Sequence, residues 1–209
     1  MDMKLSGKCT ASNSSQLASN SLRMYNYLRS GLEKLAGEYD IVLIDCSPNF
    51  NALVRNAAIA SDYYLVPARL NYFSLLGIDN LQDNVHSFFD DYRKFLMVRP
   101  DLGYESASIE MLGVVPVMVE LQRGRDGIIK AHQEYEDKMK ALGYNIFHFV
   151  RHNSTVFAPD RIVKGPVVLN AVKHSAKTQA KGSPLDKVTR DYETLGEEIL
   201  SRLGMQLKN

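Results

Sequence analysis

The sequence predicts an α/β fold in which a mostly parallel sheet is flanked by helices on both faces. Short apolar runs of strand length alternate with longer segments in which apolar residues recur at helical spacing. Hydrophobic residues make up 45% of the 209 residues and charged residues 23%, which is typical of a folded globular chain. This length suits one domain with its own core and is short for two.

The expected elements begin after a polar N-terminal segment. Residues 1–20 are rich in Ser and Asn and are predicted to be a loop or tail, so that residues 21–209 form a single domain. Apolar residues then recur at helical spacing from Leu22 to Leu35 and predict a helix that ends at Gly37. The run DIVLID, residues 40–45, is short, apolar and partly β-branched, and it predicts a strand buried on both faces.

Helices and strands are expected to alternate over the rest of the chain. The predicted helices cover residues 57–60, 74–95, 127–142 and 184–203, and the predicted strands are YYLVP (63–67), MLGVVPVM (111–118) and NIFHFV (145–150). Ligands of parallel sheets bind beyond the carboxyl ends of the strands. The candidate functional segments are therefore residues 45–49, 67–72, 119–125 and 151–158.

Composition excludes several classes of protein. The longest apolar stretch, residues 111–119, contains a proline and is too short to span a bilayer, and the N-terminus has no apolar block of the kind a secretory signal needs. Cys9 and Cys46 form no CxxC pair, which excludes zinc ribbons and thioredoxin-like sites and fits a reducing cytoplasm. The five histidines show no ligand spacing, so no metal site of that kind is predicted.

The net charge of +1 hides an uneven distribution of charge. Residues 75–110 carry seven acids and three bases, a balance of −4, whereas residues 151–187 carry seven bases and two acids, a balance of +5. Such a chain could orient itself toward a polyanion, while the simpler interpretation is two solvated faces.

The strongest local signal for chemistry is an aspartate at the end of the predicted strand. Asp45 would lie at the rim of the sheet, where one carboxylate can hold a phosphate-bound Mg²⁺ through water. Ser47 and Pro48 then form a stiff turn that could register a terminal phosphate. In the alternative interpretation Asp45 only caps the next helix.

The stretch DIVLIDCSPNFNALVRNAAIASDYYLVPARLNYFSLLGIDNL resembles the Walker-B and switch region of the ParA/Soj/MinD family of deviant-Walker P-loop ATPases. The matching positions are Asp45 and Pro48, Asn56 and Ala57, Ala60, Asp62, Pro67, Tyr72 to Leu75, and Gly77. The resemblance implies a P-loop NTPase fold of the SIMIBI type.

A fainter resemblance continues toward the C-terminus. MLGVVPVMVE is similar to the family's next strand, and Arg123 lies near the place where ParA proteins carry an arginine after it. The segment FVRHNSTVFAPDRIVKGPVV matches the family pattern at Asn153, Ala158, Pro159, Gly165 and Pro166. It departs from that pattern at Arg151, where a proline is usual.

The glycine-rich phosphate loop of the family, KGGxGKT/S, has no good counterpart. LSGKCT is the nearest match, but Lys4 and Leu5 replace glycines that let phosphate approach the backbone, and Cys9 replaces the hydroxyl that binds Mg²⁺. We therefore expect an N-terminally truncated form that corresponds to the C-terminal two-thirds of a ParA-type protein.

The resemblance, together with the basic segment, implies specific roles. They are catalysis and metal binding through water for Asp45, nucleotide-binding or switch roles for Ser47, Pro48, Arg123 and Asn153, and DNA contacts for Arg151, Arg161, Lys164, Lys173 and Lys177. ATP and Mg²⁺ are the implied cofactors, although without a phosphate loop the chain alone is expected to be inactive as an ATPase.

The expected function is plasmid or chromosome partitioning, by a ParA-like ATPase or a truncated form of one. This implies a nucleotide-dependent homodimer, or a pair with a full-length relative, that binds DNA nonspecifically, responds to a centromere-binding ParB-like protein and associates with the nucleoid in the cytoplasm. One alternative is a MinD-like membrane-cycling regulator of division-site placement. The C-terminal GEEILSRLGMQLKN is poorly basic for that role, so we expect it to pack on the sheet rather than on a membrane. The other alternative is a non-enzymatic truncated paralogue that acts by pairing with a full-length relative.

Overall fold

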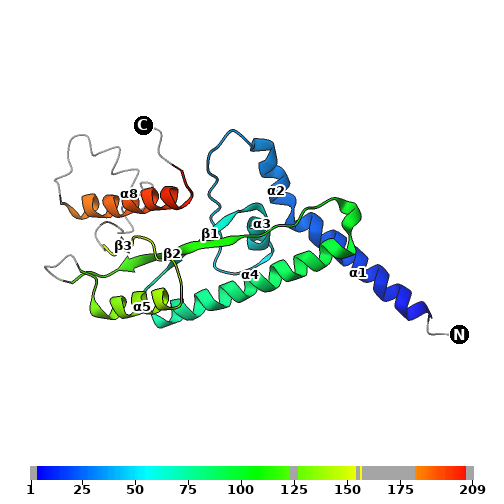
Figure 1. The fold of residues 1–209 in the computed structure, drawn as a ribbon, viewed down its shortest axis with the longest axis horizontal. Helices are drawn as coiled ribbons and strands as arrows, with labels where there is room; N and C mark the ends of the chain where they lie inside the picture. The colour runs from blue at the N-terminus through cyan, green and yellow to red at the C-terminus, as the bar shows by residue number, and fades with distance from the viewer. Residues whose placement is uncertain (1–3, 123–126, 154–155, 157–181, 206–209) are drawn as a thin grey trace. The chain divides into compact units, whose positions relative to one another are not determined.

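The computed structural model describes residues 4–122, 127–153, 156 and 182–205, with side chains from residue 13 onward (Figure 1). The chain divides into two compact units. The first unit comprises Met1–Tyr64 and Asp79–Met111, and the second comprises Leu65–Ile78 and Leu112–Asn209. Strand β1 (Tyr63–Ala68), helix α4 (Tyr72–Val98) and strand β2 (Glu110–Val119) each pass from one unit to the other.

The first unit begins with helix α1 (Lys4–Tyr25), which corrects the expectation of a loop over residues 1–20. Ala18, Leu22 and Tyr25 recur at helical spacing and are buried, and no proline interrupts the segment. Burial of this apolar face outweighs the weak helix preference of the surrounding Ser and Asn residues. Helix α1 is followed by α2 (Tyr27–Leu32) and a short 3₁₀ turn, η1 (Glu33–Leu35).

The predicted strand over DIVLID is wrong. Residues 41–47 have no regular secondary structure, and the side chains of Val42 and Leu43 are 52% and 85% exposed. A strand is defined by hydrogen bonds to a neighbouring strand, and no strand pairs with this segment in the part of the chain that the structure describes. Apolar content alone therefore does not make it a strand.

The single helix predicted from Leu22 to Leu35 is interrupted at Asn26 and corresponds to the end of α1, to α2 and to η1. The remaining predicted helices and strands are found at the expected places, with changed boundaries. They are α3 (Ala52–Ala60), β1, α4, β2, α5 (Lys130–Ala141), β3 (Val150–Arg151) and α8 (Pro184–Arg202), with a 3₁₀ turn η2 (Pro100–Leu102) between α4 and β2. Strand β3 is shorter than the run NIFHFV, because earlier in that run only Ile146 makes a bridge, to Val114 of β2.

The strands form one sheet in the order β1-β2-β3, and β3 runs parallel to β2 with Val117 opposite Val150. The register shifts between Val117 and Val119, where Met118 adopts a left-handed φ of 55°. Within the second unit, β2 and β3 lie between helices α5 and α8 (Figure 1). The fold is therefore α/β, with a parallel sheet flanked by helices.

Each unit has its own buried residues. In the first unit an apolar cluster joins α1, α3 and α4 and consists of Leu22, Tyr25, Ala58, Ile59, Val85, Phe88, Phe89, Tyr92 and Ala107. A buried polar pair accompanies it, because Asn26 donates to the Tyr92 hydroxyl at 3.0 Å. In the second unit the fully buried side chains include Val114 and Val119 of β2, Met139 of α5 and Val188 of α8.

Gly113 allows β2 to pass very close to the segment that leads into β3. Its φ of +155° is uncommon for other residues, and a Cβ placed there would lie 2.5 Å from the Asn145 carbonyl oxygen and 2.7 Å from the Phe147 ring. Only glycine fits this crossing without a shift of backbone.

Candidate functional site

The predicted nucleotide-binding turn lies in the first unit, immediately before α3. Asp45, Ser47 and Pro48 are exposed. The Ser47 hydroxyl donates to the Asn49 carbonyl and accepts from the Asn51 side chain, both at 3.4 Å. Among the described residues, the side-chain hydrogen bonds of the Asp45–Pro48 turn are therefore long and exposed.

The cap of α3 is Asn51 and not Asp45. The Asn51 side chain accepts hydrogen bonds from the backbone N–H groups of Leu53 at 3.0 Å and Val54 at 3.2 Å. These are two of the free donors at the start of the helix. The interpretation of Asp45 as a helix cap is therefore wrong.

The Asp45 carboxylate makes no hydrogen bond or ion pair with any other described residue, and it remains exposed. Partial burial of the neighbouring Cys46 thiol raises its pKa above the ordinary value, and the negative charge of Asp45 raises it further. The sequence predicts Asp45 at the end of a strand, and no strand is formed there, so what fits a water-mediated contact with Mg²⁺ is the accessibility of this carboxylate. Among the residues that the structure describes, no group of three or more His, Cys, Asp or Glu side chains is placed to hold a metal.

The segment LSGKCT is not a phosphate loop. Gly7 and Lys8 lie inside helix α1, which is continuous from Lys4 to Tyr25. A phosphate cradle needs backbone N–H groups in a glycine-rich loop before a helix. The described residues therefore contain no glycine-rich cradle for phosphates at this segment.

Asn56, one of the positions that match the family pattern, fastens α3 to the break between α1 and α2. Its side-chain oxygen accepts from the Leu28 N–H at 2.9 Å, and its amide nitrogen donates to the Met24 carbonyl. Both backbone groups lie where the helical hydrogen-bond pattern is interrupted. This asparagine therefore fixes the helix that follows the Asp45–Pro48 turn.

The second unit holds Arg151, which the sequence assigns to DNA binding. The Arg151 guanidinium donates to both oxygens of Asp191 on α8, from Nε to Oδ2 at 2.7 Å and from Nη2 to Oδ1 at 2.8 Å. The Arg151 backbone N–H donates to Oδ2 at 3.0 Å, and the Nε2 atom of His148 lies 3.4 Å from Oδ1. Because Asp191 is only 1% exposed, this pairing is a buried structural contact.

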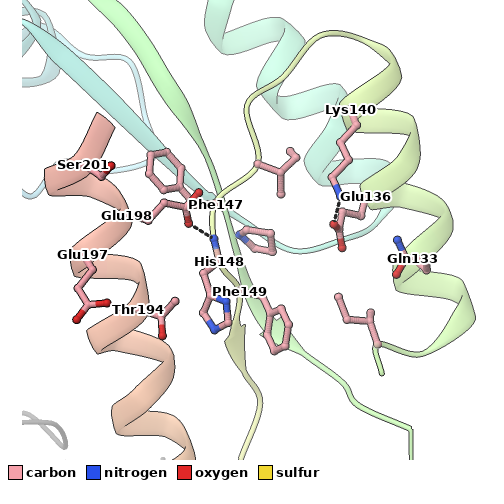
Figure 2. Close-up of a pocket in the computed structure, with 13 residues that line it drawn as sticks. Gln133, Glu136, Lys140, Phe147, His148, Phe149, Thr194, Glu197, Glu198 and Ser201 are labelled. Atoms are coloured by element: carbon pink, nitrogen blue, oxygen red, sulfur yellow. Dashed lines mark hydrogen bonds and ion pairs between the residues drawn. The ribbon is translucent and has the colours of Figure 1, made fainter. Parts of the chain in front are cut away.

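Three side chains of α8 bind backbone groups of β3 and of the segment before it, and we call them the α8 edge contacts. They are Asp191 to the Arg151 N–H at 3.0 Å, Glu198 to the His148 N–H at 2.7 Å, and Arg202 to the Ile146 carbonyl at 3.1 Å. Arg202 also pairs with Glu198 at 2.7 Å and lies 3.8 Å from the Phe147 ring centroid. Figure 2 shows Glu198 reaching the backbone of His148. Helix α8 therefore packs on the sheet, as the sequence predicts.

A cavity of about 640 Å³ opens between α5 and α8, beside residues 146–149 (Figure 2). It is lined by the apolar side chains of Pro116, Phe147 and Phe149 and by the polar side chains of Gln133 and Thr194. The ion pair on its α5 side joins Lys140 and Glu136.

The structure groups the predicted residues only in part. Asp45, Ser47 and Pro48 share one turn of the first unit, whereas Arg151 and Asn153 lie close together in the second unit, where the Asn153 side chain accepts from the Val156 N–H at 3.0 Å. The other candidates, Arg123, Arg161, Lys164, Lys173 and Lys177, lie outside the described residues. Sequence reasoning did not identify Asp191 or Glu198, although their seven-residue spacing places them on one face of α8.

A family model described as an AAA domain matches residues 5–98. The chromosome partitioning protein ParA of Myxococcus xanthus is 27% identical over 175 residues, which cover 84% of this chain and 51% of that protein. The chromosome-partitioning ATPase Soj of Thermus thermophilus is 25% identical over 166 residues, which cover 79% of this chain and 54% of that protein.

A shorter match, to the sporulation initiation inhibitor protein Soj of Bacillus subtilis, is 36% identical over 58 residues, 28% of this chain and 23% of that protein. The structure of a Cyanothece McdA variant in complex with ATP superimposes with a TM-score of 0.59 at 17% identity, and it covers 95% of this chain and 64% of McdA. The chain spans about half the length of the two longer-matching relatives. These matches agree with the pattern around Asp45 and support the ParA/MinD-type family of P-loop ATPases, and the McdA structure shows the same fold.

Proposed function

We propose that this chain is part of a ParA-like ATPase that acts in DNA segregation, through nucleotide-dependent dimerisation and nonspecific DNA binding. The observation that carries the proposal is the similarity to chromosome partitioning proteins over 175 residues, which takes in the Asp45–Pro48 turn. The exposed Asp45 carboxylate, which has no partner among the described residues, is compatible with this proposal because it is accessible to a hydrated metal ion.

In this proposal each residue of the turn has one task. Asp45 would hold Mg²⁺ through water, which needs an accessible carboxylate without a competing cation. Ser47 and Pro48 follow in the same turn and would change position with the nucleotide state. Bound Mg²⁺ would neutralise charge on the phosphates of ATP. Arg123 and Asn153 are the proposed nucleotide or switch residues of the second unit.

The proposed partners follow from the family and from charge. They are a second copy of the protein or a full-length relative, a centromere-binding ParB-like protein, and DNA of the nucleoid in the cytoplasm. The excess of five positive charges over residues 151–187 supports DNA binding, because phosphate contacts require Lys and Arg but no particular base sequence. No described helix is long and apolar enough to cross a membrane.

The proposal is tested by supplying a phosphate loop from a relative. Fusing the N-terminal P-loop segment of Myxococcus xanthus ParA to this chain should give Mg²⁺-dependent ATP hydrolysis, while the 209-residue chain alone should match the buffer blank. Asp45→Asn in the chimera should lower turnover about tenfold or more and raise the Mg²⁺ concentration needed for half-maximal rate.

Asp40→Asn is the matched control, because Asp40 is also exposed and lies only five residues earlier. It should leave both turnover and the Mg²⁺ requirement unchanged. An active chimera in which Asp45→Asn behaves like Asp40→Asn would refute the proposed role of Asp45, and a soluble, folded chimera without ATPase activity would refute the proposed function.

A further inference from the structure

Arg55 places a positive charge inside the aromatic cluster of the first unit. It lies on α3, four residues after the cap, and its Cζ is 5.6 Å from the ring centroids of both Phe50 and Phe88. Its Nη1 atom also donates to the Tyr25 hydroxyl at 3.4 Å. These distances are within the range in which a cation is attracted by the face of an aromatic ring.

This placement is costly for an arginine. The Nε atom is buried and has no hydrogen-bond partner among the described residues. Burying an unsatisfied donor of a charged group costs more than burying an apolar side chain of similar length. A leucine or methionine could fill the same space between the rings, so packing alone does not account for the arginine.

The rings that Arg55 contacts connect the core of the unit to the Asp45–Pro48 turn. Phe50 directly precedes Asn51, and its ring meets Phe88 of α4 edge to face with centroids 5.8 Å apart. Phe88 in turn meets Tyr25 of α1 edge to face at 5.0 Å. Phe50 is the first half-buried side chain after the turn, whose own hydrogen bonds are weak and exposed.

We infer that Arg55 is a positioning residue, which holds Phe50 against α4 through its guanidinium and so fixes where the Asp45–Pro48 turn lies. Its importance for catalysis rests on the proposed function, but the positioning itself is a property of the first unit alone. The cation acts through the ring of Phe50 and makes no contact with Asp45 or with a ligand.

The Cys46 thiol reports on the position of the turn. In a Cys9→Ser background and at one fixed pH, the rate of alkylation of Cys46 depends on how freely the reagent reaches the thiol. Cys46 is exposed but lies beside the core, so a turn that is no longer held through Phe50 should open the thiol further to the reagent and speed alkylation. Arg55→Leu should raise the rate about fivefold, whereas Arg55→Lys, which keeps a cation near the rings, should stay within about twofold of the parent.

A control variant on the same helix distinguishes positioning of the turn by Arg55 from a general contribution of Arg55 to stability. Val54→Ala removes half-buried apolar atoms from α3 without touching the cation, and the urea midpoints of all variants are measured alongside. If Arg55 positions the turn, Arg55→Leu should speed alkylation more than Val54→Ala at equal loss of stability, and amide hydrogen exchange of residues 45–51 should rise with it. Equal rates at equal stability, or no change in Arg55→Leu, would overturn the inference.

The alkylation assay contains no nucleotide, so its outcome is independent of the proposed ATPase. In the active chimera, Arg55→Leu should raise the half-maximal Mg²⁺ concentration severalfold, with recovery in Arg55→Lys. An inactive parent chimera would refute the proposed function and leave the alkylation result standing, whereas an active chimera with unaltered alkylation in Arg55→Leu would refute only the inference about Arg55.

Discussion

Asp191, which the sequence did not put forward, accepts hydrogen bonds from several groups at once. Its two oxygens accept from the backbone N–H, Nε and Nη2 of Arg151, and the His148 ring lies within 3.4 Å. These groups come from β3 and the residues before it, about forty positions earlier in the chain. The carboxylate therefore joins the last helix to the sheet.

Replacing Asp191 should destabilise the protein strongly. Asp191→Ala leaves the largely buried Arg151 guanidinium and its backbone N–H without this acceptor, and removing one partner of such a pair costs about 3–5 kcal/mol. We expect a loss near the lower end, about 3 kcal/mol, in urea unfolding, because 20% of the Arg151 side chain is exposed and water can reach part of it. Glu193→Ala, at an exposed position of the same helix, should change stability by less than about 0.5 kcal/mol. A similar small change in both variants would contradict this assignment.

For Arg151, the sequence does not reveal which residue it pairs with in the fold. Its charge and its place within the basic segment predict a contact with DNA. Its partner Asp191 lies far away in the sequence and only the fold brings them together. The expectation that Arg151 contacts DNA stays a prediction, but its guanidinium is already paired within the protein.

The sequence predicts an element reliably where the interactions that stabilise it lie within the same segment. The apolar periodicity of α4, α5 and α8 was enough to place these helices, since a helix makes its hydrogen bonds within itself. The segment 41–45 has the composition of a strand, but a strand depends on a neighbour that composition does not supply. Helix α1 was missed for the opposite reason, because its Ser-rich and Asn-rich surface masked the buried face of Ala18, Leu22 and Tyr25.

The pairing of β2 with the segment before β3 depends on one glycine. Gly113→Ala should lower the free energy of unfolding by about 2–3 kcal/mol, because the added Cβ would lie 2.5 Å from a backbone oxygen that cannot move without shifting the strand. Gly196→Ala on α8 is the matched comparison, since a Cβ there meets nothing within 4 Å, and it should stabilise by about 0.5–1 kcal/mol. Thermal or urea unfolding of the two variants should shift in opposite directions. A neutral Gly113→Ala would mean that the strands do not approach this closely in solution.

Over the whole molecule, charge is the property most relevant to the proposed partners. Residues 75–110 carry seven acids and three bases and should be repelled by a polyanion. Residues 151–187 carry seven bases and two acids and should be attracted by it.

The candidate site could be predicted from the sequence as far as the Asp45–Pro48 turn, where the motif is contiguous. The roles of Arg55 and Asp191 depend on distant partners and became visible only in the fold.

The basic segment should determine the affinity for DNA. In the ATP-bound chimera, we expect Arg161→Ala with Lys164→Ala to weaken binding to duplexes of arbitrary sequence and to reduce the slope of log K against log salt by about 2, since each phosphate contact contributes about 0.9. Lys130→Ala with Lys138→Ala on α5 removes the same charge elsewhere in the second unit and should leave the slope nearly unchanged. Fluorescence anisotropy at several salt concentrations measures both. Equal slopes in the two double variants would place the DNA-binding surface outside this segment.

The α8 edge contacts restrict how the length of this helix can vary. Asp191, Glu198 and Arg202 are separated by seven and four residues, which correspond to about two turns and one turn of helix. One residue inserted between Asp191 and Glu198 would rotate the following side chains by about 100° and carry both Glu198 and Arg202 away from the backbone of residues 146–148. Substitutions at exposed positions such as Glu193 leave this spacing intact. Among relatives that keep these contacts, α8 should therefore be free to change its surface residues but not the number of residues between its three contact points.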